Sequence, residues 1–403
     1  MKKGWPVTRL GDLTDLVTKG TTPTSIGHEF VEQGINFIKV ESITATGQFI
    51  EEKFAHITPS CHADLRRSQL QTGDILFSIA GALGRTGFVT DNILPANTNQ
   101  ALAIIRLKRD VGLSPRFVLK ALETGVVLEQ IEKFKGGVAQ QNLSLAQVRD
   151  FQIAAPPLEE QKRIVAKLDE AFVGLAKAKE NAEQNLQNAR ALFESHLDSV
   201  FTQRGPGWVE KRLKEVCEKI TDGTHQTPKY FNEGIVFLSS RNVTSGTIDW
   251  ENIKYIDTKQ HLEMHKRVAP RRDDILLAKN GTTGVAAIVD RDTVFDIYVS
   301  LAHLRALDVI RPRFLLHFIN SPVAKLQFNR RLKGIGVPNL HLEEIREVCI
   351  AYPSDPKVQD HVAAALDELA EETQRLACIY EQKLEALESL KRSILHEAFS
   401  GNL

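Results

Sequence analysis

The feature that most restricts the fold of this chain is a long segment that occurs twice without an insertion or a deletion. A shift of 198 positions places residues 158–201 on residues 356–399, so that Gln161 falls on Gln359 and Phe201 on Phe399. In both copies apolar or small residues recur at steps of three and four, which is the spacing of one face of an α-helix. At about 1.5 Å per residue, each copy predicts a rod of roughly 65 Å. A narrow apolar stripe on so long a rod needs a partner helix, and the nearest candidate is the other copy.

The equal length of the two copies is informative, because loops change length freely whereas a spacer whose length matters does not. We interpret the two helices as a ruler of fixed length. We expect them to pair antiparallel as a coiled coil, with the apolar stripes forming the shared core.

The regions that precede the two helices also repeat. Trp5 corresponds to Trp208, and the Gly-Asp-Ile-Leu sequence at 73–76 corresponds to Asp-Asp-Ile-Leu at 273–276. The chain is therefore organised as head, helix, head, helix, with boundaries at residues 1–157, 158–201, 202–355 and 356–403. Between matching anchors the two heads differ strongly in sequence, as expected of one scaffold that carries two different surfaces.

Each head is predicted to be of mixed α+β class. Short β-rich runs bounded by Gly, Asn and Asp turns occur in the first head at residues 35–40, 75–79, 88–89 and 101–107. A helix with proline at its first position is predicted at residues 115–134 and again at 312–332. With antiparallel helices the two heads would be related by a pseudo-twofold axis, and Leu403 would end near Trp5.

The composition is that of an ordinary globular chain, with 42% hydrophobic and 25% charged residues among 403. No apolar run reaches the roughly 18 residues that cross a bilayer, and the first residues lack the apolar core of a signal peptide. We therefore expect a cytoplasmic protein with no membrane partner. The net charge is zero, but the heads carry a modest positive excess and the helices the compensating negative one. A polyanion is expected to meet the heads, and protein partners the helices.

Several of these sequences resemble the DNA specificity subunit of type I restriction-modification enzymes. The resemblance lies in Pro-Pro-Leu-Glu-Glu-Gln-Lys-Arg-Ile at 156–164, Leu-Lys-Arg-Ser-Ile-Leu at 390–395 and Ala-Phe-Ser-Gly at 398–401, together with the two variable heads. It implies a non-catalytic subunit of a restriction endonuclease and adenine methyltransferase complex. Each head would be a target-recognition domain that reads one half of a split double-stranded DNA sequence.

The same resemblance implies the partners. The helices would set the length of the nonspecific DNA spacer and dock two methyltransferase subunits, and restriction (motor) subunits would complete the complex. The chain would have no cofactor of its own, because S-adenosylmethionine, ATP and magnesium would belong to those partners. Reversing the charges of Glu180, Glu183, Glu381 and Glu385 is expected to weaken assembly if the acidic helix face is the docking surface.

Three pairs of loops are candidates for DNA contact, because hydroxyl, amide and cationic side chains can read base edges or bind phosphates. The candidate residues lie in a polar loop of each head, in the glycine-rich turn after each Ile-Leu strand and in the loop that follows each predicted helix. Two further candidates lie elsewhere in the second head. In the first head the candidates are Thr21, Thr24, Ser25, Arg85, Lys135, Gln140 and Gln141. In the second head they are Thr224, His225, Lys229, Arg241, Asn242, Lys279, Asn280, Thr282, Thr283, Arg330 and Arg331. For each loop, a plain turn or helix-capping role remains the alternative.

Other patterns do not support catalysis or metal binding. His261 and His265 stand four apart, but Cys61 and Leu65 occupy the aligned places of the first head, so we expect no metal site. The four cysteines lack Cys-x-x-Cys spacing. No phosphate-binding loop or methylase motif is present. The alternatives to a DNA-reading subunit are a tandem scaffold that binds no DNA, and a free-standing nuclease or methyltransferase.

Overall fold

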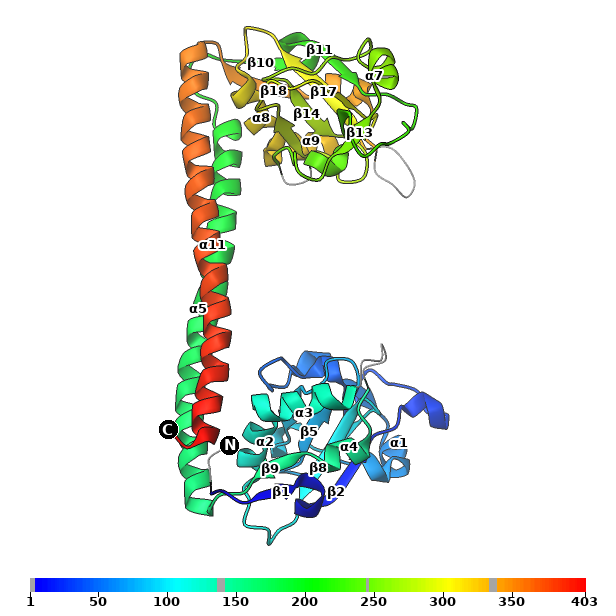
Figure 1. Ribbon diagram of the computed structural model, residues 1–403, viewed down its shortest axis with the longest axis vertical. Helices are drawn as coiled ribbons and strands as arrows, with labels where there is room; N and C mark the ends of the chain where they lie inside the picture. Colours follow the sequence, from blue (N-terminus) through cyan, green and yellow to red (C-terminus); the bar gives the residue numbers. More distant parts are fainter. Residues whose placement is uncertain (1–3, 136–141, 244–245, 333–338) are drawn as a thin grey trace. The chain divides into compact units, whose positions relative to one another are not determined.

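The computed structural model describes residues 4–135, 142–243, 246–332 and 339–403. The chain forms two compact units (Figure 1). Unit 1 contains residues 1–182 and 382–403, and unit 2 contains residues 183–381. Each unit therefore combines one head with one part of each long helix. Within the described residues, no helix has both the length and the apolar character that a bilayer span requires.

Head one, in unit 1, is built on two small sheets and a strand pair. The four-stranded antiparallel sheet has the order β2 (Thr14–Lys19), β8 (Leu102–Leu107), β5 (Ile75–Ser78) and β6 (Thr86–Phe88). The three-stranded sheet has the order β4 (Ala55–Ile57), β3 (Ile35–Ile38) and β7 (Ala96–Thr98), and β1 (Val7–Arg9) pairs with β9 (Gln152–Ala154). Two short helices, α1 (Pro59–Asp64) and α4 (Leu145–Arg149), lie between the strands in sequence.

Head two, in unit 2, has the same strand orders. Its four-stranded sheet consists of β11 (Cys217–Asp222), β17 (Leu301–Ala306), β14 (Ile275–Ala278) and β15 (Ala286–Ile288). Its three-stranded sheet consists of β13 (Lys254–Ile256), β12 (Ile235–Leu238) and β16 (Phe295–Ile297), and β10 (Trp208–Arg212) pairs with β18 (Cys349–Pro353). The short helices are α6 (Leu213–Val216), α7 (Thr258–Met264) and α10 (Leu342–Arg346). The two heads thus share one scaffold, as their sequence anchors predicted.

The helix predicted in each head is in fact two helices. Residues 115–134 form α2 (Pro115–Leu122) and most of α3 (Gly125–Lys135), and residues 312–332 form α8 (Pro312–Asn320) and α9 (Pro322–Asn329). In head two the break has a clear cause. Ser321 leaves the helical conformation, its hydroxyl accepts a hydrogen bond from the Ala324 N–H, and Pro322 occupies the first helical position.

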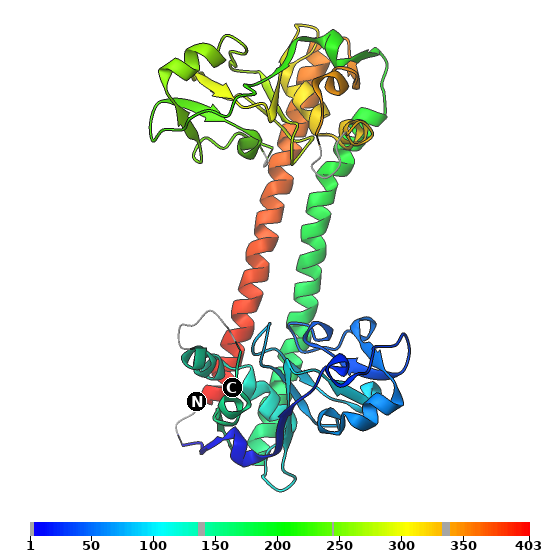
Figure 2. The ribbon, with the colours of Figure 1, turned by 90° about the vertical axis from the view of Figure 1, so that its right-hand side faces the viewer.

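The long helices are α5 (Leu158–Thr202) and α11 (Pro356–Ser400), and they run antiparallel in both units. In unit 1 Lys179 of α5 pairs with Glu388 of α11 at 2.7 Å, and in unit 2 Arg190 pairs with Glu381 at 2.6 Å. Residue numbers therefore rise along α5 as they fall along α11, and in the turned view of Figure 2 the two helices can be followed separately through each unit. The antiparallel pairing is confirmed.

One glutamine in each long helix fixes it to a head. Gln161 is fully buried, and its side-chain oxygen accepts from the Ser114 N–H at 2.8 Å while its amide donates to the carbonyls of Gly112 and Pro156. Gln359 makes the same three bonds in unit 2, to the N–H of Arg311 and the carbonyls of Val309 and Pro353. A side-chain amide can donate two hydrogen bonds and accept one at the same time, whereas a hydroxyl has one hydrogen to donate and a carboxylate none, which explains the glutamine in both copies.

The chain ends where the sequence predicted. Trp5 and Leu403 both pack against the hydrophobic core of unit 1, and the Arg163 guanidinium donates to the Leu403 carbonyl. All four cysteines are free thiols, and Cys61 and Cys217 are buried.

Candidate nucleic-acid interface

A glycine sets the course of the polar loop in each head. The backbone of Gly20 runs so close to β7 that an added Cβ would lie 1.7 Å from the Thr98 carbonyl oxygen, and at Gly223 the distance to the Ile297 oxygen would be 1.9 Å. No side chain fits at such distances, so glycine is required. The chain therefore leaves β2 and β11 across the neighbouring three-stranded sheet and continues into the predicted loops.

The polar loop of head one presents small hydroxyl side chains. Thr24 and Ser25 are exposed within a short 3₁₀ turn, and Thr21 is half-buried. The Ser25 hydroxyl donates to the Thr22 carbonyl at 2.7 Å, which closes the turn. The exposed hydroxyls can reach a ligand, but the Ser25 hydroxyl also stabilises the turn. Contact with DNA and a plain turn role therefore both stay predictions for this loop.

In head two the polar loop and the glycine-rich turn meet at Asp222. This carboxylate is buried and is surrounded by Arg267, Lys279 and His225, with the Lys279 Nζ atom at 3.3 Å. Burial alone raises the pKa of Asp222, but the hydrogen bond from Arg267 and the charge of Lys279 outweigh it, so the pKa is lowered. His225 remains at the surface, with its side chain 62% exposed, and Thr224 is half-buried. The two permanent cations around one buried anion leave this region with a local positive excess.

Three of the predicted DNA-contact residues have partners within their own head. Lys279 is buried and its ammonium is paired with Asp222. Asn242 is buried, and its amide donates to the carbonyls of Asp249 and Asn252. The Arg85 guanidinium donates to the carbonyls of Val40 and Ile43. These side chains hold their own loops together; Lys279 and Asn242 are buried and Arg85 is half-buried, and their contact with DNA stays a prediction.

The glycine-rich turns have the same backbone in both heads. Gly281 and Gly284 have φ of +76° and +83°, and the Gly284 N–H donates to the Ala278 carbonyl; Gly81 and Gly84 do the same in head one. Thr282 is exposed at the tip and Thr283 is half-buried. Asn280 forms a β-bridge with Asn339, and within the described residues the buried Oδ1 atom of each has no hydrogen-bond partner. Asn339 therefore lies beside the glycine-rich turn of head two.

The remaining candidates are less tightly placed. Arg330 is exposed, whereas Arg331 donates to the Gln327 carbonyl; both line a small cavity of about 290 Å³. Lys135 is the last residue of α3, and Gln140 and Gln141 lie outside the described residues. Arg241 is exposed and close enough to Tyr230 to act on it: burial raises the pKa of the Tyr230 hydroxyl, and Arg241 opposes that rise.

An exposed aromatic ring beside a lysine was missed by the sequence analysis and occurs in both heads. In head one the Lys39 ammonium lies 4.6 Å from the centre of the Phe30 ring, and in head two Lys254 lies 3.9 Å from the Tyr230 ring. Lys229 also lies 5.7 Å from the Phe231 ring. All three rings are more than a third exposed. Aromatic faces with adjacent cations bind nucleic acid by stacking and charge. An aromatic residue a few positions after each polar loop was the available signal.

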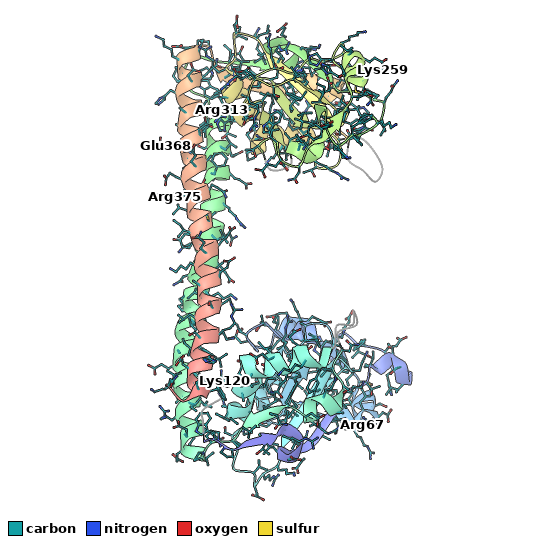
Figure 3. The ribbon with its side chains drawn as sticks, viewed as in Figure 1. Arg67, Lys120, Lys259, Arg313, Glu368 and Arg375 are labelled. Carbon is teal, nitrogen blue, oxygen red and sulfur yellow. The ribbon has the colours of Figure 1, made fainter. Side chains whose placement is uncertain are left out.

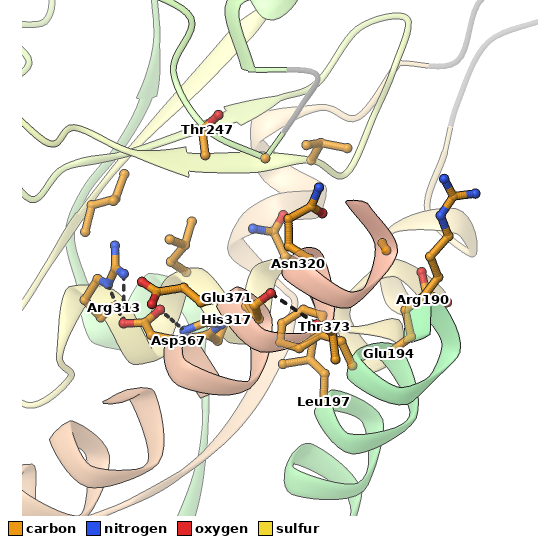
Figure 4. Close-up of a pocket in the computed structure, with 18 of the residues that line it drawn as sticks. Arg190, Glu194, Leu197, Thr247, Arg313, His317, Asn320, Asp367, Glu371 and Thr373 are labelled. Atoms are coloured by element: carbon orange, nitrogen blue, oxygen red, sulfur yellow. Dashed lines mark hydrogen bonds and ion pairs between the residues drawn. The ribbon is translucent and has the colours of Figure 1, made fainter. Parts of the chain in front are cut away.

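A second site lies where each head meets the helices. In unit 2 a cavity of about 860 Å³ is bordered by α5, α8 and α11, and in it Asp367 of α11 accepts from Arg313 and His317 of α8, each at 2.8 Å (Figure 4). Burial lowers the pKa of His317, and the Asp367 charge opposes this. In unit 1 a cavity of about 450 Å³ contains the equivalent contacts of Asp169 with Arg116 and Lys120. Figure 3 labels Arg313 and Lys120 at these junctions. Both clusters serve to fix a head on a helix.

The outer faces of the helices are charged and also carry exposed apolar side chains. Glu368 and Arg375 extend from α11 on the side away from head two (Figure 3). Leu192 of α5 and Leu390 of α11 hold equivalent positions in the two copies and are 51% and 47% exposed. Of the glutamates predicted to dock partners, Glu180 pairs with Lys177 and Glu381 with Arg190, while Glu183 and Glu385 are exposed. Exposed leucines on these helices were not anticipated.

Two domains that bear variable loops, each fixed to one end of a long helix, define a class of paired-domain recognition proteins. The model of the type I restriction modification DNA specificity domain matches residues 2–184 and 206–386. The chain therefore belongs to this family, as a DNA sequence-specificity subunit of a type I restriction-modification system. Each match, like each compact unit, ends inside a long helix.

Similar proteins agree with this assignment. The specificity subunit of the type I restriction enzyme EcoBI from Escherichia coli is 23% identical over 82% of this chain and 73% of its own length. The MjaIX specificity subunit from Methanocaldococcus jannaschii is 22% identical over 89% and 85%. Two solved structures have the same fold. A chain from a study of complex assembly and conformational transition of the type I R-M system gives a TM-score of 0.79 at 21% identity, over 100% and 99% of the two chains. The HsdS subunit from Thermoanaerobacter tengcongensis gives 0.58 at 20%, over 100% and 98%.

Proposed function

We propose that each head reads one half of a split DNA target. The support is that both heads have one scaffold and one glycine-directed loop course but different side chains on the loops. Thr24 and Ser25 of head one are replaced in head two by a loop that carries His225 and Lys229. A shared scaffold with different surface side chains suits two domains that bind the same kind of ligand but recognise different sequences.

The reading face of each head consists of its polar loop, its glycine-rich turn and its aromatic–lysine pair. Hydroxyl groups such as Thr282, and the imidazole of His225, are suited to donors and acceptors at base edges. Lys39, Lys229 and Lys254 are suited to phosphates, which position the domain on the duplex without reading sequence. The rings of Phe30 and Tyr230 offer apolar surface to sugars and bases. The buried Asp222 cluster supports this face from below.

The long helices set the distance between the half-sites and dock two methyltransferase subunits. The repeated, ungapped length of α5 and α11 supports the first role, and the equivalent exposed residues Leu192 and Leu390 support two equal docking positions. In this proposal the chain is non-catalytic. S-adenosylmethionine, ATP and magnesium are bound by methyltransferase and restriction subunits, and activity requires those subunits.

The observation that carries the proposal is the pairing of two specificity-domain matches with two differently surfaced heads. The test is methylation mapping in a host that expresses this chain with its cognate methyltransferase, compared with a host that lacks only this chain. We expect one bipartite motif with a constant spacer, which disappears without the chain. Replacing residues 1–157 by the corresponding head of a relative should change one half of the motif and leave the other half and the spacer intact.

Variants of the reading face refine the same experiment. Tyr230→Ala in head two should relax or weaken recognition of one half-site, and Phe30→Ala in head one should affect the other. Lys259→Ala, on the exposed side of α7 (Figure 3), is the matched control and should leave the methylome unchanged. If the methylomes with and without the chain are the same, although the expressed chain assembles with the methyltransferase, a scaffold that binds no DNA is favoured instead. Salt-insensitive binding of the complex would point the same way.

A further inference from the structure

Head two contains a buried carboxylate whose surroundings differ from those of every other buried carboxylate in the described part of the chain. Asp74 is paired with Arg106, Asp222 with Arg267 and Lys279, and Asp274 with Arg305. Asp296 is 1% exposed, and its partners among the described residues are two imidazoles. A buried negative charge requires a compensating cation or strong hydrogen bonds. Of these four carboxylates, Asp296 is the one without a permanent cation.

The two imidazoles come from one short helix. His261 of α7 and His265, the residue that ends this helix, direct their Nδ1 atoms at separate oxygens of Asp296, at 2.7 and 3.0 Å. Their ring centres are 4.6 Å apart, and one ligand atom from each of the three side chains lies within 4.8 Å of the others. The sequence predicted no site here, because Asp296 is about thirty residues away and is contributed by β16.

We propose that His261, His265 and Asp296 form a binding site for a divalent transition-metal ion of the zinc class. Two imidazoles and one carboxylate are a ligand set that suits zinc, whereas magnesium and calcium prefer oxygen ligands alone. With metal–ligand bonds of roughly 2.0–2.2 Å, the observed nitrogen–oxygen separations correspond to angles of roughly 80–90° at the ion. A small outward movement of the imidazoles accommodates it. The ion supplies the positive charge that Asp296 lacks, and water completes the coordination.

Head one shows what happens when the charge is absent. Asn97 occupies the position of Asp296, and Leu65 follows its helix as His265 does, but the His62 Nδ1 atom contacts the Asn97 oxygen much as His261 contacts Asp296. The Asn97 nitrogen donates to the Leu65 carbonyl and the Ser68 hydroxyl, so this neutral side chain is satisfied without a cation. Head one thus keeps one imidazole beside this position, but it has neither the carboxylate nor, among its described residues, a second imidazole bonded to it. The metal site belongs to head two alone.

The ion acts as a clamp between α7 and the three-stranded sheet. Beside His261, Gln260 of α7 accepts from the Lys229 N–H at 2.8 Å and donates to the Lys229 carbonyl at 2.9 Å. Fixing α7 to β16 therefore also fixes the backbone of the polar loop of head two. This consequence rests on the proposed DNA-reading role of that loop, but the metal site does not.

The experiment uses the full chain, stripped of metal with a chelator and titrated with Zn²⁺ alone by calorimetry, and with Co²⁺ alone by visible absorption. We expect one ion per chain and a cobalt spectrum without thiolate charge-transfer absorption, because no cysteine is a ligand. His265→Leu and Asp296→Asn, which introduce the residues of head one, should each weaken binding by more than about 100-fold, beyond the effect of altering a residue that only orients a ligand.

The control is His225→Ala, an exposed histidine of the same head outside the cluster, which should bind Zn²⁺ like the unmodified chain. Circular dichroism establishes that each variant is folded, and the two ligand variants test the site independently. The proposal is overturned if the unmodified chain binds no Zn²⁺, or if both ligand variants retain its affinity. Neither result depends on DNA binding, so this site and the DNA-reading role can fail separately.

Discussion

Phe399, at the end of α11, packs against Phe117 of head one with the ring centres 5.1 Å apart. In unit 2 Phe201, at the end of α5, packs against Phe314 of head two at 5.3 Å. All four rings are at most 4% exposed. Each head is therefore held by the start of the helix that follows it, through Gln161 or Gln359, and by the end of the other long helix. This double attachment is why the motif near the C-terminus repeats the sequence that precedes head two.

Removing either ring should destabilise the unit that contains it. Phe399→Ala and Phe201→Ala should each lower the free energy of unfolding by about 3–5 kcal/mol, because a buried aromatic ring is lost and a cavity remains. Urea unfolding of the full chain, followed by circular dichroism, measures the effect. Leu390→Ala, at an exposed position of the same helix as Phe399, is the control and should change stability by less than about 0.5 kcal/mol. Equal effects at positions 390 and 399 would contradict the double attachment.

Glycine substitutions separate required glycines from dispensable ones. Gly223→Ala places a Cβ 1.9 Å from the Ile297 carbonyl oxygen, so the loop must move, and we expect a loss of more than about 2 kcal/mol in stability. Gly174 lies on the exposed side of α5, where an added Cβ would have no neighbouring atom within 4 Å. Gly174→Ala should therefore stabilise the chain by about 1 kcal/mol, through the higher helix propensity of alanine. Thermal unfolding should show a lower melting temperature for Gly223→Ala and a higher one for Gly174→Ala.

The parts of this fold that could be predicted from the sequence are those set by local periodicity. The long helices have an uninterrupted spacing of three and four over forty residues, and the observed limits of α5 and α11 fall within a residue of the predicted ones. The break between α8 and α9 was missed although Pro322 marks it, because the apolar pattern continues across it. The same periodicity that revealed the long helices concealed this interruption.

The candidate site was less predictable, because exposure of a polar side chain is decided by partners far along the chain. Lys279 was indistinguishable in sequence from a surface lysine, yet Asp222, on another strand, draws it into the interior. The Arg85 guanidinium bonds carbonyls more than forty residues earlier in the chain. Conversely, the stacking of Lys254 on Tyr230 joins two segments that no local pattern connects.

Asp274 makes the stability of head two depend on pH. Burial alone raises the pKa of this carboxyl, but hydrogen bonds from Arg305 and His303 outweigh it and lower the pKa to about 2, from 3.8. Because the folded-state value is the lower one, the stabilisation is complete above the unfolded value and is lost as pH falls from about 5 towards 2. The shift corresponds to about 2 kcal/mol.

The variant Asp274→Asn isolates this contribution. It should be clearly less stable than the unmodified chain at pH 7, and the difference should narrow as the pH approaches 2. The control is Asp273→Asn, because Asp273 is exposed and asparagine tolerates its φ of 68°. Urea unfolding at several pH values provides the measurement. A difference between Asp274→Asn and the unmodified chain that is independent of pH would contradict the assignment.

Lysines of the reading face should determine the salt dependence of DNA binding. If Lys254 contacts a phosphate, Lys254→Ala in the assembled complex should weaken binding to all sequences alike and reduce the slope of log affinity against log salt by about 1. Tyr230→Ala should weaken binding with little change in that slope, since it removes no charge. Fluorescence anisotropy with cognate and scrambled duplexes, at several salt concentrations, distinguishes the two. An unaltered slope in Lys254→Ala would remove this lysine from the interface.

Leu192 and Leu390 should each govern the docking of one methyltransferase subunit. Both are about half exposed at equivalent places of the two helix copies, and a charged residue at the centre of an apolar contact leaves an uncompensated charge on association. Leu192→Glu or Leu390→Glu alone should therefore reduce the assembly to one methyltransferase per chain, and the double variant should abolish it. Native mass spectrometry of the co-expressed proteins reports the stoichiometry. Glu183→Lys with Glu385→Lys tests exposed charges elsewhere on the same two helices and should weaken assembly less, because exposed ion pairs contribute at most about 1 kcal/mol. If the charge reversals abolish assembly while the leucine variants leave two methyltransferases bound, the acidic residues rather than the leucines form the docking contact.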